Sequence, residues 1–254
     1  MTDMYATLRQ TLRQQLLTDR LLGADALPVA LPGKRRDGAE CAAVVPTDPA
    51  VVQDKAKRLE VLNETQVRGC TKCGLAATRT QTVFGQGNPA ARLVFVGEAP
   101  GFEEDRQGLA FVGRAGQLLT RMIAAMGLSR DDVFICNVLK CRPPNNRDPA
   151  ADEVLACSPY LREQLRIIEP EVLIALGSPA AKTLLNTNQS IGKLRGRFHD
   201  YYLSGVPGEG EPIPLMPTYH PAYLLRNPAE KVKAWADLQM VMHLLGLPLP
   251  KRKT

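Results

Sequence analysis

The sequence has few aromatic residues, few histidines and no long apolar run. Of its 254 residues only 5% are aromatic, three are histidine and one is tryptophan. No apolar run approaches the ~20 residues that a membrane-spanning helix needs, so we expect no membrane partner. The first residues lack a basic region leading into an apolar one, which predicts no secretory signal and a cytoplasmic location.

The composition is otherwise that of a globular protein with a small positive charge. Hydrophobic residues make up 44%, and 32 Lys and Arg against 26 Asp and Glu give +6. These values rule out global disorder and suit a polyanionic partner, although many basic proteins have none. We expect the protein to act as a monomer.

The chain divides into three parts. Residues 1–47 predict an amphipathic helix followed by a flexible linker of Ala, Pro, Gly and charged residues. Residues 48–247 predict the folded domain, whose first helix begins at Asp48 with a proline in its first turn. Residues 248–254 form a basic tail.

Strands and helices alternate in the folded domain. This alternation is typical of a three-layer α/β fold with a parallel sheet. Short apolar runs predict strands at residues 93–96, 133–135, 172–176 and 213–218.

Three loops that follow predicted strands are rich in polar, Gly or Pro residues. They span residues 97–111, 137–149 and 219–226. Ligands of such sheets bind beyond the carboxyl ends of the strands, so we expect the three loops to converge on one cleft.

The first of these loops begins with the run GEAPG at residues 97–101 and continues into carboxylates. Two glycines and a proline after a buried strand force a tight turn, whose exposed N–H groups can hold an anion or a carbonyl oxygen. The run is not the GxGxxG dinucleotide fingerprint. A plain connection with an acidic, solvated face is the alternative.

Four cysteines form two plausible pairs. Cys70 and Cys73 are a CxxC pair, and Cys141 and Cys157 lie at the two ends of a segment that can fold back on itself. Four thiolates suit Zn²⁺ or a [4Fe–4S] cluster, and spacing does not choose between them.

The third loop carries His220, followed by Leu224, Leu225 and Arg226. A neutral imidazole can donate a hydrogen bond to a carbonyl that gains negative charge. Exposed leucines can wedge into a base stack, and arginine can pair with a phosphate. A structural histidine beside two core leucines is the alternative.

Asn137 and Phe111 are further candidates. The amide of Asn137 offers a donor and an acceptor, which matches one edge of a pyrimidine, and the Phe111 ring can stack on a base. A turn asparagine and an ordinary core phenylalanine are the alternatives.

Four runs in this order resemble the family 4 uracil-DNA glycosylases, the iron–sulfur branch of that superfamily. They are GEAPG at 97–101, FVGRAGQLL at 111–119, NVLKCRPP at 137–144 and HPAYLLR at 220–226. The resemblance implies a sandwich with a central four-stranded parallel sheet, a [4Fe–4S] cluster on the four cysteines, and hydrolysis of the N-glycosidic bond of uracil in DNA.

The resemblance also implies the roles of the site residues. Asn137 would read the uracil edge and Phe111 would stack on the ring. The Ala99 backbone would contact a carbonyl, and Glu104 would lie near C5 and exclude a thymine methyl.

The catalytic residues implied are Asn137, His220 and Glu98. His220 would face O2 of uracil, and Glu98 would stabilise the sugar cation or orient water. Leu224, Leu225 and Arg226 would contact the DNA. Two other functions stay open: a non-catalytic nucleic-acid-binding module on the same fold, and an iron–sulfur, nucleotide-dependent oxidoreductase.

Overall fold

The computed structural model describes residues 48–249; the helix and linker expected in residues 1–47, and the end of the basic tail, lie outside the described residues. The strands are β1 Gln86–Gly87, β2 Leu93–Gly97, β3 Phe134–Asn137, β4 Val172–Leu176, β5 His199–Tyr201 and β6 Ile213–Thr218. The α-helices are α2 Pro49–Leu62, α3 Phe102–Gln107, α4 Arg114–Ala125, α5 Ala151–Ile168, α6 Ser178–Leu185, α7 Ile191–Leu194, α8 Pro221–Arg226 and α9 Lys231–Leu244. A π-helical turn, η1 Asn63–Val67, and three 3-10 turns, η2 Gly74–Ala77, η3 Pro144–Asn146 and η4 Pro228–Glu230, complete the described elements.

The strands form one mixed sheet of six, in the order β1-β3-β2-β4-β6-β5. Neighbours among β3, β2, β4 and β6 are parallel, whereas β1 and β5 pair antiparallel at the two edges. The four strands expected are therefore the parallel centre of a larger mixed sheet, and the two antiparallel edge strands were not expected. The edge strands have two and three residues, too few to show an apolar pattern in the sequence.

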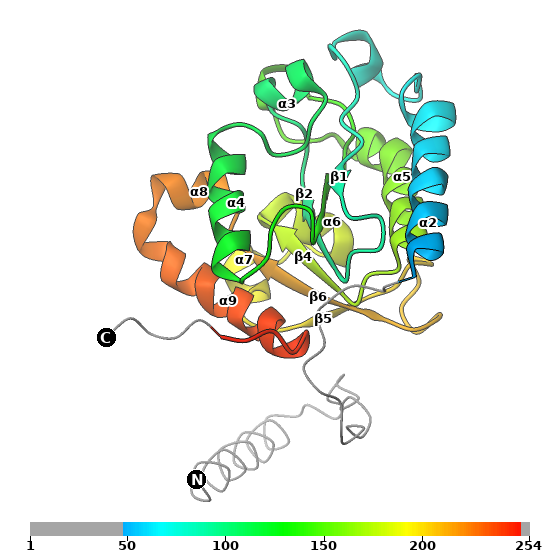
Figure 1. Cartoon of the computed structure of the whole chain (residues 1–254). Helices are drawn as coiled ribbons and strands as arrows, with labels where there is room; N and C mark the ends of the chain where they lie inside the picture. The colour runs from blue at the N-terminus through cyan, green and yellow to red at the C-terminus, as the bar shows by residue number, and fades with distance from the viewer. Residues whose placement is uncertain (1–47, 250–254) are drawn as a thin grey trace, which may run out of the picture. The chain divides into compact units, whose positions relative to one another are not determined.

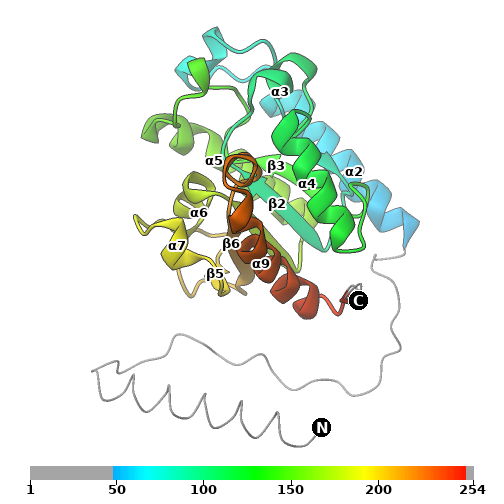
Figure 2. The same ribbon diagram turned by 90° about the vertical axis from the view of Figure 1, so that its left-hand side faces the viewer.

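Helices cover both faces of the sheet (Figures 1 and 2). Val94 and Val96 of β2 pack in the cluster that includes side chains of α2, α5 and α6, while Leu93 and Phe95 pack in the cluster with α4 and α9. All five residues of β2 are buried, as a strand covered on both sides requires.

The helix starts follow the local signals in part. Asp48 caps α2, because its carboxylate accepts a hydrogen bond from the amide of Ala50. Pro228, by contrast, begins only the 3-10 turn η4, and the last helix, α9, follows from Lys231. Among the helices of residues 48–249, none combines the length and hydropathy that crossing a membrane requires.

The parallel strands carry the candidate residues at one edge of the sheet. β2 ends at Gly97 and β3 at Asn137, and these two residues pair directly. β4 ends just before Gly177, and β6 ends at Thr218, two residues before His220. Because parallel strands place their carboxyl ends together, the loops after them share this edge.

Candidate functional site

The centre of the site is the bare Cα of Gly97. A Cβ placed on Gly97 would lie 2.3 Å from Oδ1 of Asn137 and 2.6 Å from Cζ of Phe111. The amide of one strand and the ring of a separate loop therefore meet where only glycine leaves room. Asn137 is 1% exposed, and its Oδ1 is buried without a hydrogen-bond partner among the described residues. Such an orphan acceptor is costly unless a ligand satisfies it.

The loop that presents Phe111 is strained and held from several sides. Phe111 has φ 55°, in the left-handed region that favours glycine. Arg130 donates to the carbonyls of Ala110 and Phe111 at 2.8 and 3.3 Å. Helix α4 packs against this backbone at Gly116, where a Cβ would stand 1.7 Å from the Phe111 oxygen. The surroundings thus impose the conformation of the ring-bearing residue.

Glu104 braces the same loop. Its Oε1 accepts from the amides of Val112 and Gly113 at 2.9 and 3.0 Å, just where α4 begins. Its Oε2 would lie 2.7 Å from a Cβ on Gly101. The Glu104 carboxylate is therefore fixed between the first loop and the Phe111 loop.

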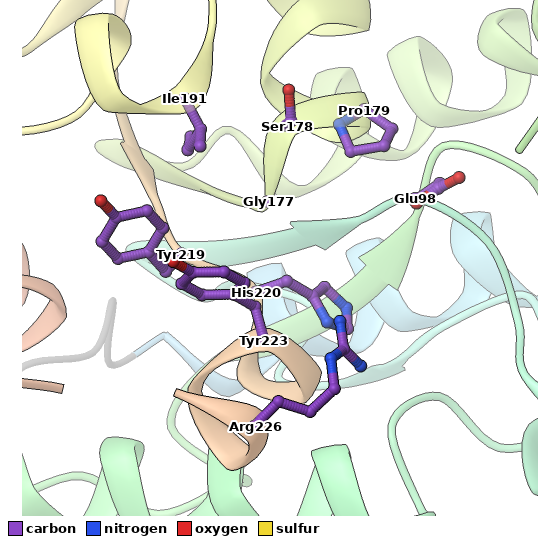
Figure 3. A pocket seen from close by; sticks show the side chains of 9 residues that line it. All are labelled: Glu98, Gly177, Ser178, Pro179, Ile191, Tyr219, His220, Tyr223 and Arg226. Atoms are coloured by element: carbon purple, nitrogen blue, oxygen red, sulfur yellow. The ribbon is translucent and has the colours of Figure 1, made fainter. Parts of the chain in front are cut away.

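His220 stands beside Phe111, with ring centroids 5.7 Å apart. Burial and the positive charge of Arg226 lower the pKa of His220 to about 4, against the opposing effect of Glu104. In Figure 3 the Arg226 side chain reaches from α8 toward the imidazole. The imidazole is therefore neutral near pH 7.

The tautomer of His220 follows from its hydrogen bond. Nδ1 accepts from the amide of Ala222 at 3.1 Å at the start of α8. A neutral ring that accepts at Nδ1 carries its proton on Nε2. His220 therefore has a donor available for a ligand.

A cavity of about 480 Å³ opens beside these residues (Figure 3). Glu98 borders it on the side away from Tyr219 and Ile191. Burial and the negative charge of Asp148 raise the pKa of Glu98 to about 7. The residues that line the cavity are Glu98, Gly177, Ser178, Pro179, Ile191, Tyr219, His220, Tyr223 and Arg226.

The contacts thus join Glu98, Asn137 and His220 into one region. Asn137 and Phe111 both approach the Cα of Gly97, the Phe111 ring lies beside that of His220, and His220 lines the same cavity as Glu98.

One expectation about the third loop is wrong. Leu224 is 1% exposed, because α8 turns it inward against Leu118 and Ala234. It is a core residue and does not reach DNA from this position. Leu225 is 39% exposed, and Arg226 is also exposed.

The turn after β4 also borders the cavity, and the sequence pattern did not point to it. Gly177 has φ 92°, and a Cβ there would approach Cβ of His220 to 2.9 Å. The rule that ligands bind beyond strand ends would have pointed to Gly177 and Ser178, because β4 lies in the middle of the sheet.

The four cysteines line one small cavity. Cys141 and Cys157 are buried, and Cys70 and Cys73 pack against them together with Ala99 from the first loop. As placed, no group of three or more His, Cys, Asp or Glu side chains within residues 48–249 is arranged to hold a metal ion.

The surroundings of the sulfurs nevertheless suit anionic thiolates. Arg79 donates to Sγ of Cys141 at 3.3 Å, the Tyr160 hydroxyl to Sγ of Cys70 at 3.2 Å, and the Lys140 amide to Sγ of Cys157 at 3.2 Å. Hydrogen bonds to sulfur are typical of iron–sulfur sites. Burial raises the pKa of the free Cys157 thiol to about 11, so ionisation at neutral pH would need a bound cation. The donor set therefore fits a metal centre.

Comparison with known proteins yields a consistent set of relatives. Residues 84–239 match the family model described as the Uracil DNA glycosylase superfamily. A type-4 uracil-DNA glycosylase of Saccharolobus solfataricus is 47% identical over 71% of this chain and 84% of its own length. Proteins of the same name from Thermotoga maritima and Archaeoglobus fulgidus are 46% and 42% identical, over 69% and 73% of this chain and 87% and 92% of theirs.

Replacing Gly116 by alanine should destabilise the protein. Alanine inside a helix ordinarily stabilises by ~0.5–1 kcal/mol relative to glycine, but here the Cβ would overlap the Phe111 carbonyl and displace the loop. We expect a loss of about 1–3 kcal/mol in the free energy of unfolding, measured with denaturant. Gly192→Ala in α7 is the control, since nothing lies within 4 Å of its Cβ position. If Gly116→Ala and Gly192→Ala were equally stable, the close approach of Gly116 to the Phe111 carbonyl would be contradicted.

Proposed function

This chain belongs to the type-4 uracil-DNA glycosylases of the uracil DNA glycosylase superfamily, and we propose that it flips uracil out of DNA and hydrolyses the N-glycosidic bond to leave an abasic site. The observation that carries the proposal is the orphan Oδ1 of Asn137, which shares the space above Gly97 with the Phe111 ring, a ring that in turn lies beside the neutral His220. Residues 48–247 would carry the activity.

Asn137 selects the base in this proposal. The N3–H group of uracil can donate a hydrogen bond to Oδ1 of Asn137, and the NH₂ of the same amide can donate to O4 of uracil. Neutral cytosine has no hydrogen on N3 and would leave Oδ1 unsatisfied, so cytosine is rejected. Phe111 stacks on the ring held at this edge.

Glu104 and Ala99 complete the base site. Because two backbone amides fix Glu104, its carboxylate can serve as a rigid wall near C5 and exclude the methyl group of thymine. The backbone of Ala99, which follows Glu98 in the tight first loop, contacts a uracil carbonyl.

His220 stabilises the leaving group. Bond cleavage leaves a uracil anion whose charge gathers on O2 and O4, and the Nε2–H of His220 donates to O2. A neutral imidazole suits this role, because the proton stays on Nε2 while the charge develops.

Glu98 acts on the sugar side. As a carboxylate it stabilises the oxocarbenium-like sugar or orients the attacking water. With a pKa of about 7 it is about half ionised at neutral pH, so its charge state affects the rate.

Residues of α8 make the proposed contacts to DNA. Flipping a nucleotide costs a few kcal/mol of lost stacking, and exposed Leu225 fills the space left in the duplex. Arg226, at the mouth of the cavity, pairs with the backbone phosphate. Leu224 has no part in this step, since it is buried.

The cysteine site holds a [4Fe–4S] cluster in this proposal, with Cys70, Cys73, Cys141 and Cys157 as ligands. When bound, such a group cross-links the loop around Cys70 to the segment from Cys141 to Cys157. That segment begins four residues after Asn137, so the cross-link would stabilise the end of β3, which carries the amide that reads the base. Zn²⁺ is the alternative occupant. We further propose that the protein acts as a cytoplasmic monomer.

A single assay tests the function. Incubation with a uracil-containing oligonucleotide, followed by alkali, should yield strand scission at the uracil. Binding of that oligonucleotide without scission would instead support a non-catalytic binding module. Nicotinamide or flavin binding without scission would support the oxidoreductase, which the comparisons do not favour.

Replacement of His220 by alanine should lower the single-turnover excision rate by ~10²–10³ while DNA binding persists, because one donor to the developing anion is lost. His199→Ala is a matched control, since His199 lies on edge strand β5 and bonds to the carbonyl of Leu194. Excision by His220→Ala at the wild-type rate would remove His220 from the mechanism.

The excision rate should depend on the ionisation of Glu98. Its pKa of about 7 lies above the ordinary value, so the carboxylate is protonated below that pH and ionises as the pH rises through it. We expect the single-turnover rate to increase over this interval and then level off. Glu98→Gln should be slower and show no step near pH 7; a step retained in Glu98→Gln would assign it to another group.

Replacement of Cys141 by alanine should remove the visible absorption of the cluster and lower the melting temperature, because one ligand and the cross-link are lost. Cys136→Ala is the control, since Cys136 is buried in β3 and does not line the cysteine cavity. Metal analysis of the wild type should find iron; a colourless protein that contains zinc would overturn the cluster assignment.

A further inference from the structure

The most deeply buried charged side chain near the site is that of Lys140. It is 1% exposed and lies between Asn137, the end of β3, and Cys141. Its side chain turns back along the chain, and Nζ donates to the backbone carbonyl of Asn137 at 2.8 Å. Nζ also donates to Oε1 of Gln164 on α5.

The partners of Lys140 are themselves fixed. Gln164 is 0% exposed, and its Nε2 donates to the carbonyl of Phe84 at 2.8 Å. The Lys140 carbonyl accepts from Val83 at 2.7 Å. The side-chain nitrogen of Lys140 therefore connects the Asn137 peptide to Gln164, whose own position is fixed by its hydrogen bond to Phe84.

The same residue touches the cysteine site. Its backbone amide donates to Sγ of Cys157 at 3.2 Å. Burial lowers the pKa of Lys140, and the neighbouring sulfurs of Cys136, Cys157 and Cys141 act against that shift. Within residues 48–249, Lys140 has no ion pair with a carboxylate. A buried ammonium without a negative neighbour is strongly unfavourable.

Lys55 is a second buried lysine, and its hydrogen-bond and ion-pair partners can be compared with those of Lys140. It is 8% exposed, and its Nζ also donates to a backbone carbonyl, that of Ile168, at 2.9 Å. Unlike Lys140, it has a carboxylate partner, Glu169, at 2.7 Å. Among the described residues, the Nζ of Lys140 is instead held by two uncharged oxygens, that of the Asn137 peptide and that of the Gln164 side chain.

We propose that Lys140 is a positioning residue that couples the cysteine site to base recognition: its backbone amide is bonded to the sulfur of Cys157, and its Nζ holds the Asn137 peptide and thereby the amide that reads uracil. The inference rests on the proposed function. Lys140 touches no substrate in this scheme and acts through Asn137.

The test compares Lys140→Met with Lys55→Met in the iron-loaded protein. Each variant loses a buried amino group that donates to a backbone carbonyl, so both should be less stable than the wild type. Only Lys140→Met should also lower the single-turnover excision rate, by about 10²-fold, since small displacements of a substrate-positioning group have effects of that size. Its affinity for an abasic-site oligonucleotide should equal that of Lys55→Met, because no DNA contact is removed.

A second readout does not depend on catalysis. Free uracil has no glycosidic bond to cleave, and Lys140→Met should bind it about tenfold more weakly than the wild type, because the amide that reads the base is displaced. Lys55→Met should bind free uracil as the wild type does. Equal uracil affinities of Lys140→Met and Lys55→Met would overturn the coupling of Lys140 to base recognition.

Gln164→Leu covers the case in which Lys140→Met does not fold. This variant removes the side-chain oxygen that accepts from Nζ of Lys140 and leaves every cysteine in place. We expect slower excision with iron content intact. Excision by the folded variants at the rate of Lys55→Met would overturn the proposal, whereas failure of the wild type to excise uracil would count against the proposed function instead.

Discussion

The site depends on the close approach of Asn137 and Phe111 to the bare Cα of Gly97. Any side chain at Gly97 would displace the amide of β3 and the ring of the loop before α4. This close approach needs the strained backbone of Phe111, which Arg130, Glu104 and the packing of α4 at Gly116 hold in place. Rigid surroundings of this kind let a short polar side chain discriminate between bases.

Burial gives the two ionisable groups of the cavity complementary properties. It keeps the His220 imidazole neutral, with its proton directed by the hydrogen bond from Ala222, and it brings the pKa of Glu98 close to neutrality. One group therefore suits an anionic leaving base and the other a cationic sugar. Neither property belongs to the residue type alone; each follows from its position at the carboxyl edge of the sheet.

The cysteine site and the base site are adjacent parts of one structure. Ala99 of the first loop packs against the cluster that contains Cys141 and Cys157, and the segment from Asn137 to Cys141 runs from one site to the other. In our proposal, a metal centre that only cross-links the chain can therefore affect base recognition without taking part in the chemistry. In our proposal Lys140 is the connecting residue, since its side chain and its amide face different sites.

The sequence by itself determined the parts that local pattern encodes: the four parallel strands read from apolar runs, the cap at Asp48, the four grouped cysteines, and the loops that carry Glu98, Asn137 and His220. Only the tertiary structure decided which side chains are buried. Leu224 turned inward because α8 packs on α4, and the turn at Gly177 joined the cavity because β4 lies in the middle of the sheet. Edge strands β1 and β5 and the burial of the Lys140 side chain were likewise decided there, since strand pairing and burial arise between segments distant in sequence.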